Sequence, residues 1–225
     1  MHSNYKVNEL FQTIQGEGHF TGLPAIFVRL QGCDVGCAWC DTKNTWHIDP
    51  DKETQLTNLT DQSNDSDCWA GVTAQDIIDE IKRLGYSANL VVITGGEPCM
   101  YDLRELTTLL HQYAFQTQIE TSGTHPILVD DRSWVTLSPK VNMRGGKAIL
   151  SSALERANEI KHPVGTEHDI AQLDELLASL ISIQNKVICL QPISQKSRAT
   201  ALCSRVCIER NWRLSVQVHK YLGID

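Results

Sequence analysis

Short runs rich in β-branched and apolar residues alternate along the chain with stretches in which apolar residues recur every three or four positions. The first pattern is typical of buried strands and the second of amphipathic helices. Strands are predicted at residues 25–31, 90–94, 116–121, 134–138, 186–191 and 213–218, with a weaker candidate at 160–164. This alternation predicts an α/β fold with a parallel sheet built from βα units.

The best-defined helix signal starts at Thr73. This residue is a good N-cap, Asp76 follows three positions later, and Gly85 ends a pattern of apolar residues on one face. Further helices are predicted at residues 103–113, 154–160 and 170–180, and in the segment before Asn211.

Polar residues, glycines and prolines follow the strands at 31–33, 94–98, 120–123, 138–140 and 191–194. The carboxyl ends of parallel strands meet at one edge of a sheet, where α/β proteins bind their ligands. The chemistry is therefore expected at that edge. Six or seven βα units, rather than eight, predict a partial, open-sided (β/α) TIM-like barrel.

The segment 49–71 departs from this rhythm. Asp, Asn, Thr, Ser and Gln dominate it and no hydrophobic period persists. We interpret it as an extended loop or insertion within a single domain that spans residues 1–225.

Composition narrows the classes of function. The chain has 225 residues, of which 41% are hydrophobic, and this is enough for one domain with a buried core. Its formal charge of −7 offers no basic surface to a polynucleotide, so no nucleic-acid partner is expected. The amino terminus is polar and no apolar run is long enough to cross a bilayer. We therefore expect a cytoplasmic protein with no membrane partner.

Three of the eight cysteines, Cys33, Cys37 and Cys40, stand close together, whereas the other five are scattered and are expected to be ordinary thiols. Three thiolates on a loop after a strand can bind three irons of a [4Fe–4S] cluster and leave the fourth iron for an exchangeable ligand. The alternative is a structural zinc site completed by His47.

A CxxxCxxC loop after one strand and Gly95-Gly96-Glu97-Pro98 after the next resemble the signature of radical S-adenosylmethionine (SAM) enzymes. Trp39 matches an aromatic residue before the third cysteine. The resemblance implies that SAM chelates the open iron and yields a 5′-deoxyadenosyl radical. The SAM-binding residues that it implies are Trp39, Gly96, Glu97, Ser138 and Lys140, with Ser122 and Gln191 as weaker candidates for which a turn or capping role is equally compatible.

Other stretches resemble the 7-carboxy-7-deazaguanine synthase family over nearly the whole chain. They are FQTIQGEG at 11–18, RLQGC at 29–33, CDT at 40–42, ETSGT at 120–124, SPK at 138–140 and QPIS at 191–194. The short cysteine loop is similar to that of a bacterial branch of this family. The resemblance implies a lyase of queuosine biosynthesis that converts 6-carboxy-5,6,7,8-tetrahydropterin into 7-carboxy-7-deazaguanine with loss of ammonia, and that regenerates SAM.

The same resemblance implies a set of substrate-binding residues: Ile14, Gln15, Gly16, Glu17, Arg29 and Thr94. Two roles are compatible with Arg29: it could bind the pterin carboxylate, or it could form a buried structural ion pair within the protein. Thr42 would supply an oxygen to Mg²⁺. A flavodoxin- or ferredoxin-like electron donor and a homodimer are also implied, and no acid or base is assigned.

Two alternatives remain at this stage. A glycyl-radical-enzyme activase also uses a CxxxCxxC loop on a small partial barrel, but the FQTIQGEG stretch and Cys40-Asp41-Thr42 disfavour it. A non-catalytic zinc or cluster module belongs to another class, and it would be distinguished by the metal that it binds.

Overall fold

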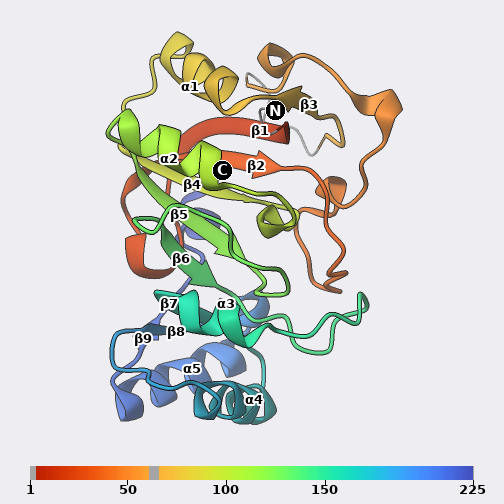
Figure 1. The fold of residues 1–225 in the computed structure, drawn as a ribbon. Coiled ribbons are helices and arrows are strands. Elements are labelled where there is room, and N and C mark those ends of the chain that lie inside the picture. Colours follow the sequence, from red (N-terminus) through yellow and green to blue (C-terminus); the bar gives the residue numbers. More distant parts are fainter. Residues whose placement is uncertain (1–3, 61–65, 225) are drawn as a thin grey trace.

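The computed structural model describes residues 4–60 and 66–224. Its centre is a nine-stranded sheet in the order β3-β1-β2-β4-β5-β6-β7-β8-β9 (Figure 1). The strands are β1 (Tyr5–Ile14), β2 (Pro24–Leu30), β3 (Ala70–Val72), β4 (Leu90–Gly95), β5 (Gln116–Thr121), β6 (Trp134–Leu137), β7 (Glu159–Val164), β8 (Val187–Pro192) and β9 (Arg213–Leu214). From β2 to β9 all neighbouring strands are parallel. Within the described chain, β3 and β9 are the two edge strands and do not pair with each other, so the sheet is open. The predicted open-sided barrel is confirmed.

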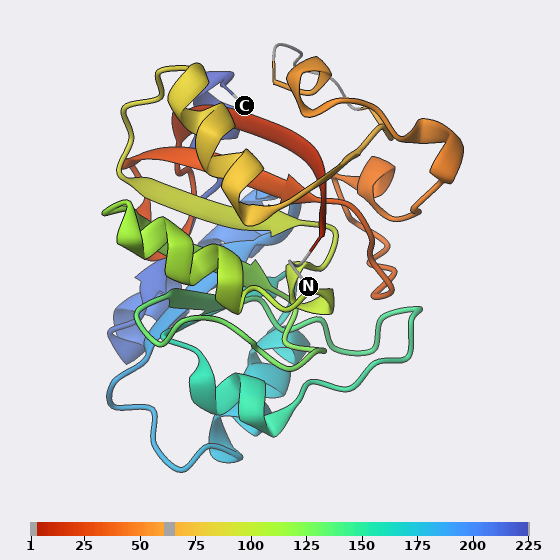
Figure 2. The ribbon, with the colours of Figure 1, turned by 45° about the horizontal axis from the view of Figure 1, so that its top comes forward.

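Helices connect the parallel strands and cover one face of the curved sheet (Figure 1). They are α1 (Ala74–Arg83), α2 (Arg104–Gln112), α3 (Ser151–Arg156), α4 (Glu167–Ala178) and α5 (Ser197–Arg210). A further short helix, α6 (Val218–Leu222), follows β9. α1 and α2 lie side by side in front of the sheet in Figure 2, and α4 and α5 pack on β7 and β8. As predicted, Thr73 and Asp76 form a capping box at the start of α1.

The strand β1 was missed by the sequence pattern, which placed the first strand at residue 25. β1 runs antiparallel to β2 and also pairs with β3. Its register shifts between Val7 and Glu9, so the alternation of buried and exposed positions breaks and Asn8 is buried. The Asn8 side-chain amide donates to the carbonyls of Ser66 and Cys68. The FQTIQGEG stretch thus begins inside a strand.

The helix predicted at 154–160 is too long, because α3 ends at Arg156 and β7 begins at Glu159. Leu154, Ala157 and Ile160 are all buried, but they reach the core from different elements. At the other end of the sheet, β9 has two residues where a strand over 213–218 was expected, because α6 starts at Val218. The sequence pattern gave no sign of α6.

The segment 49–71 is folded where the structure describes it. Short 3₁₀ turns occupy Pro50–Lys52 and Leu56–Asn58, and β3 begins at Ala70. Trp69 donates its indole N–H to the Asp49 carbonyl at 2.9 Å, which brings the two ends of the segment together. Residues 61–65 of this predicted loop lie outside the described residues.

Among the described residues, no helix combines the length and the apolar character that a bilayer span requires.

Candidate active site

A cavity of about 510 Å³ opens at the carboxyl ends of the parallel strands. Every site residue expected from the sequence lines it: Ile14, Gln15, Gly16, Glu17, Arg29, Cys33, Cys37, Trp39, Cys40, Thr42, Thr94, Gly96, Glu97, Ser122, Ser138, Lys140 and Gln191. The structure therefore brings together residues from seven separate stretches of the chain. Their individual roles stay predictions.

The cysteine loop (residues 31–47) closes on itself through its first residue. The buried Gln31 side chain donates to the carbonyls of Asn44 at 3.0 Å and His47 at 2.7 Å. The backbone N–H of Cys33 donates to the Trp46 carbonyl at 3.0 Å. Gly32 has a φ of +104°, which favours glycine at this turn out of β2. These contacts hold the loop over the cavity.

The three thiols of this loop are free and face the same cavity. Cys40 Sγ accepts a hydrogen bond from the Trp46 indole N–H at 3.4 Å. Burial raises the pKa of the Cys33 thiol to about 11, and it also raises the pKa of Cys37. Binding to iron would therefore have to displace protons from these sulfurs.

The Gly-Gly-Glu-Pro turn after β4 is locked to the start of the cysteine loop. Gly96 N–H donates to the Leu30 carbonyl at 2.9 Å, and Glu97 N–H donates to the Gly32 carbonyl at 2.8 Å. A Cβ added at Gly96 would lie 2.1 Å from the Gly32 carbonyl oxygen. The glycine thus permits contact between two protein loops, in addition to any approach of a ligand.

The carboxylate of Glu97 is buried and heavily hydrogen-bonded. Oε1 accepts from Cys99 N–H at 2.9 Å and from the Thr121 hydroxyl at 2.6 Å. Oε2 accepts from both the backbone N–H and the hydroxyl of Ser122. Ser122 therefore has a structural role in orienting Glu97. Beside them, Lys140 donates to the Ser138 hydroxyl at 2.8 Å, and burial lowers the pKa of this lysine.

A second group of residues that line the cavity centres on Lys161, whose side chain is 5% exposed. Its ammonium lies 2.6 Å from Glu17 Oε2 and 2.8 Å from Glu120 Oε2. Glu17 Oε1 also accepts from Gln217 at 2.9 Å and from Gln191 at 3.4 Å. We call Glu17, Glu120, Lys161 and Gln217 the carboxylate wall.

The two glutamates of the carboxylate wall have very different pKa values. For Glu17, burial favours the neutral acid, but the Lys161 ammonium outweighs burial and leaves the pKa at about 2. For Glu120, burial dominates and raises the pKa to about 7, with the neighbouring charges of Glu17 and Glu159 adding to the effect. Burial alone would lower the pKa of Lys161, yet the surrounding carboxylates raise it above its usual value. Glu120 is thus the group in this wall that changes protonation near neutral pH.

A row of amides extends the carboxylate wall. Gln15 Nε2 donates to Gln118 Oε1, and Gln118 Nε2 donates to Glu120 Oε1, both at 3.0 Å. Nearby, Arg29 Nε donates to Glu9 Oε2 at 2.5 Å, so the ion pair considered from the sequence does form, although Arg29 also lines the cavity.

The helix α6 closes this side of the cavity. Val218 N–H donates to the Gly16 carbonyl at 3.0 Å. A Cβ at Gly16 would lie 2.3 Å from His219 Nδ1, so a larger residue would have to displace the His219 side chain.

Comparison with known proteins agrees with this geometry. Residues 14–132 match the family model described as "4Fe-4S single cluster domain". The 7-carboxy-7-deazaguanine synthase of Escherichia coli strain K12 is 60% identical over 98% of this chain and 99% of its own length. The chain belongs to the 7-carboxy-7-deazaguanine synthase family. The synthase of Buchnera aphidicola is 45% identical over the same shares. The crystal structure of QueE from Escherichia coli matches with a TM-score of 0.94 at 59% identity, covering 96% of this chain and 95% of that one.

Membership of the 7-carboxy-7-deazaguanine synthase family implies a [4Fe–4S] cluster and SAM as cofactors, as predicted. The residues present fit them, because three free thiols and a buried carboxylate face one cavity. In the described part of the chain, no three His, Cys, Asp or Glu side chains gather closely enough to hold a single metal ion, which is what the zinc alternative requires. The family assignment also favours the synthase over the activase.

Sequence reasoning missed several polar residues of this synthase-family cavity: Glu120, Lys161, Gln217, His219 and Lys220. Glu120 and Lys161 carried a weak signal, because each is a charged residue inside a predicted strand that is otherwise uncharged at buried positions. Gln217 and His219 follow the last strand, and no sequence signal marked them as site residues.

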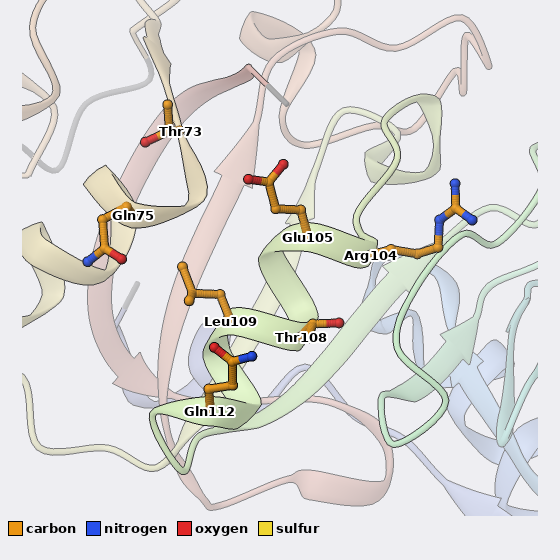
Figure 3. A pocket seen from close by; sticks show the side chains of 7 residues that line it. All are labelled: Thr73, Gln75, Arg104, Glu105, Thr108, Leu109 and Gln112. Carbon is orange, nitrogen blue, oxygen red and sulfur yellow. The ribbon is translucent and has the colours of Figure 1, made fainter. Parts of the chain in front are cut away.

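A second hollow of about 500 Å³ lies between α1 and α2 (Figure 3). None of the seven residues that line it belongs to the predicted site of a 7-carboxy-7-deazaguanine synthase: Thr73, Gln75, Arg104, Glu105, Thr108, Leu109 and Gln112.

Proposed function

We propose that this chain converts 6-carboxy-5,6,7,8-tetrahydropterin into 7-carboxy-7-deazaguanine with loss of ammonia, as a carbon–nitrogen lyase of queuosine biosynthesis. The observation that carries this proposal is the lining of one cavity. The thiols of the cysteine loop and the residues of the carboxylate wall line the same space. One space can thus receive both a radical-generating cofactor and a flat polar heterocycle.

The residues proposed to hold SAM surround the cysteine loop. The cluster and SAM, when bound, supply the one-electron chemistry that produces a 5′-deoxyadenosyl radical. Glu97 would accept hydrogen bonds from the methionyl amine, and Lys140 would pair with its carboxylate. Trp39, Gly96 and Ser138 complete this side, while Ser122 acts through Glu97 and Gln191 lies next to Glu17.

The carboxylate wall and its neighbours suit a pterin. The aminopyrimidinone edge of a pterin presents N–H donors. The side-chain oxygens of Glu17 and Gln15 can accept hydrogen bonds from them. Ile14, Gly16 and Thr94 would contact the ring. The Arg29 guanidinium has five N–H donors, and its pair with Glu9 uses one, so it can also bind the substrate carboxylate.

Loss of ammonia requires that a proton reach the departing nitrogen. Lys161 is a poor donor because its neighbouring carboxylates strengthen its hold on the proton and raise its pKa. Glu120, with a pKa raised by burial to about 7, can release a proton from its carboxyl group near neutral pH. We therefore assign Glu120 the role of general acid, for which the sequence offered no candidate.

Several finer features of the proposal come from the family resemblance. Thr42 lines the cavity and would give Mg²⁺ one oxygen, with water and the substrate carboxylate as further ligands. A flavodoxin- or ferredoxin-like protein would deliver electrons near Trp39, which is 45% exposed. We further propose a single cytoplasmic domain that forms a homodimer.

The proposal is tested by anaerobic reconstitution with iron and sulfide, followed by incubation with SAM, reductant, Mg²⁺ and 6-carboxytetrahydropterin. Mass spectrometry should detect 7-carboxy-7-deazaguanine from the unchanged protein and none from Cys37→Ala. Cys68→Ala is the matched control, because Cys68 lies outside the cavity lining, and it should retain full activity. A protein that cleaves SAM without forming the product would contradict the deazaguanine assignment and keep the radical chemistry.

A further inference from the structure

Asp34, the residue after the first cysteine, joins the cysteine loop to two other loops. Its Oδ2 lies 3.3 Å from His125 Nε2 and 2.7 Å from Lys147 Nζ. One residue further along, the Val35 carbonyl accepts from Gly145 N–H at 3.0 Å. The loops after β2 and β6 accordingly project together from the same end of the sheet in Figure 2. The proposed reaction gives Asp34 no role.

From His125 the contacts continue inward to Glu97. His125 Nδ1 lies 3.1 Å from Thr124 Oγ1, and Thr124 Oγ1 lies 2.8 Å from Ser122 Oγ. The Ser122 hydroxyl then donates to Glu97 Oε2. Carboxylates only accept hydrogen bonds, so the imidazole donates at the Asp34 end and the serine donates at the Glu97 end. We call Asp34, His125, Thr124 and Ser122 the Asp34 relay.

The inner part of the Asp34 relay is buried. Ser122, Thr124 and Glu97 are buried, and the His125 side chain is 17% exposed. Hydrogen bonds in such surroundings reinforce one another and restrict the groups that form them. The Lys147 contact differs, because that lysine is 42% exposed. The path through His125 connects the cysteine loop with the Glu97 carboxylate by side chains.

We propose that the Asp34 relay is a positioning device that fixes the Glu97 carboxylate relative to the cysteine loop. This inference rests on the proposed function, in which Glu97 binds the SAM amine and the cysteines bind the cluster that SAM chelates. SAM then spans both ends of the relay, so an error in their spacing weakens its binding. The relay residues other than Ser122 lie outside the cavity lining and act only through Glu97 and the loop.

The test compares two substitutions at Thr124. Thr124→Val removes the hydroxyl and keeps the side-chain shape, whereas Thr124→Ser keeps the hydroxyl. In the reconstituted protein, calorimetry should give a Kd for SAM about tenfold higher for Thr124→Val, and a value within about twofold of the unchanged protein for Thr124→Ser. The change that SAM causes in the electron paramagnetic resonance spectrum of the reduced cluster should be smaller in Thr124→Val only.

Two further variants make the test decisive. Lys147→Ala removes the other partner of Asp34 and should leave the Kd for SAM within about twofold. His125→Phe interrupts the relay at a second point and should also raise the Kd for SAM about tenfold. It takes the place of Thr124→Val in the test if Thr124→Val does not fold. Equal SAM affinity in Thr124→Val and the unchanged protein would overturn the inference, and so would an equal loss in Thr124→Val and Thr124→Ser. Since the assay contains no pterin, failure to form deazaguanine would overturn the proposed function alone.

Discussion

The two groups of residues that line the cavity are built from the sequence in different ways. The cysteine loop is held by contacts between near neighbours, such as Gln31 with Asn44 and His47. The carboxylate wall depends on residues far apart in the chain, up to 200 positions for Gln217 and Glu17. The first group is therefore recognisable as a motif, whereas the second group exists only after the sheet has formed.

The largest effect is expected from Lys161→Met. This change leaves the carboxylates of Glu17 and Glu120 buried without their shared cation, which should lower the free energy of unfolding by about 3–5 kcal/mol. The control Lys52→Met removes an exposed pair with Asp67 and should cost about 0–1 kcal/mol. Urea unfolding at pH 7.5 measures both. Equal costs would show that the carboxylate wall does not depend on Lys161.

Glu120→Gln should lower kcat by about a thousandfold through loss of the general acid. In the unchanged protein, kcat should fall as the pH rises through about 7, the pKa that burial gives this carboxyl, because the acid form donates the proton. The variant should lack this fall. Product formation measured from pH 6 to pH 9 tests the assignment, and an unchanged pH profile in Glu120→Gln would refute it.

His162, next to Lys161 on β7, should make the protein sensitive to acid. Its Nε2 donates to the Asp169 carbonyl at 2.9 Å, and burial lowers its pKa to about 4. Between the ordinary value of 6.5 and about 4, the unfolded chain binds one more proton than the folded chain. The free energy of unfolding therefore falls with falling pH, by about 3 kcal/mol in total. His162→Gln should lose less stability between pH 7 and pH 4.5, and equal losses in urea unfolding would contradict this.

On the cysteine side, Gly96→Ala should cost about 1–3 kcal/mol, because its methyl group would meet the Gly32 carbonyl. Since the clash displaces the cysteine loop, reconstituted iron per chain should fall as well. Gly165→Ala is a suitable control, because a Cβ there meets its nearest atoms at 3.6 Å. Normal iron content in Gly96→Ala would show that this close contact does not shape the cluster site.

Much of the fold was predictable because parallel strands and amphipathic helices have strong periods. β5 was predicted with its exact bounds, and α1 with its capping box. β1 was not, since its bulge breaks the period of two. At the site, residues in contiguous motifs were found, while Lys161 was missed because a lysine within a strand gains meaning only when two distant carboxylates converge on it.

The distant partners of Glu17 have a consequence for synthesis of the chain on the ribosome. The cysteine loop and Glu97 emerge early, and all their mutual contacts can form while most of the later strands are still unmade. The Glu17 carboxylate has to wait for Lys161 and then for Gln217 before its oxygens are satisfied. During translation, the contacts between the cysteine loop and Glu97 can therefore form well before those that complete the carboxylate wall.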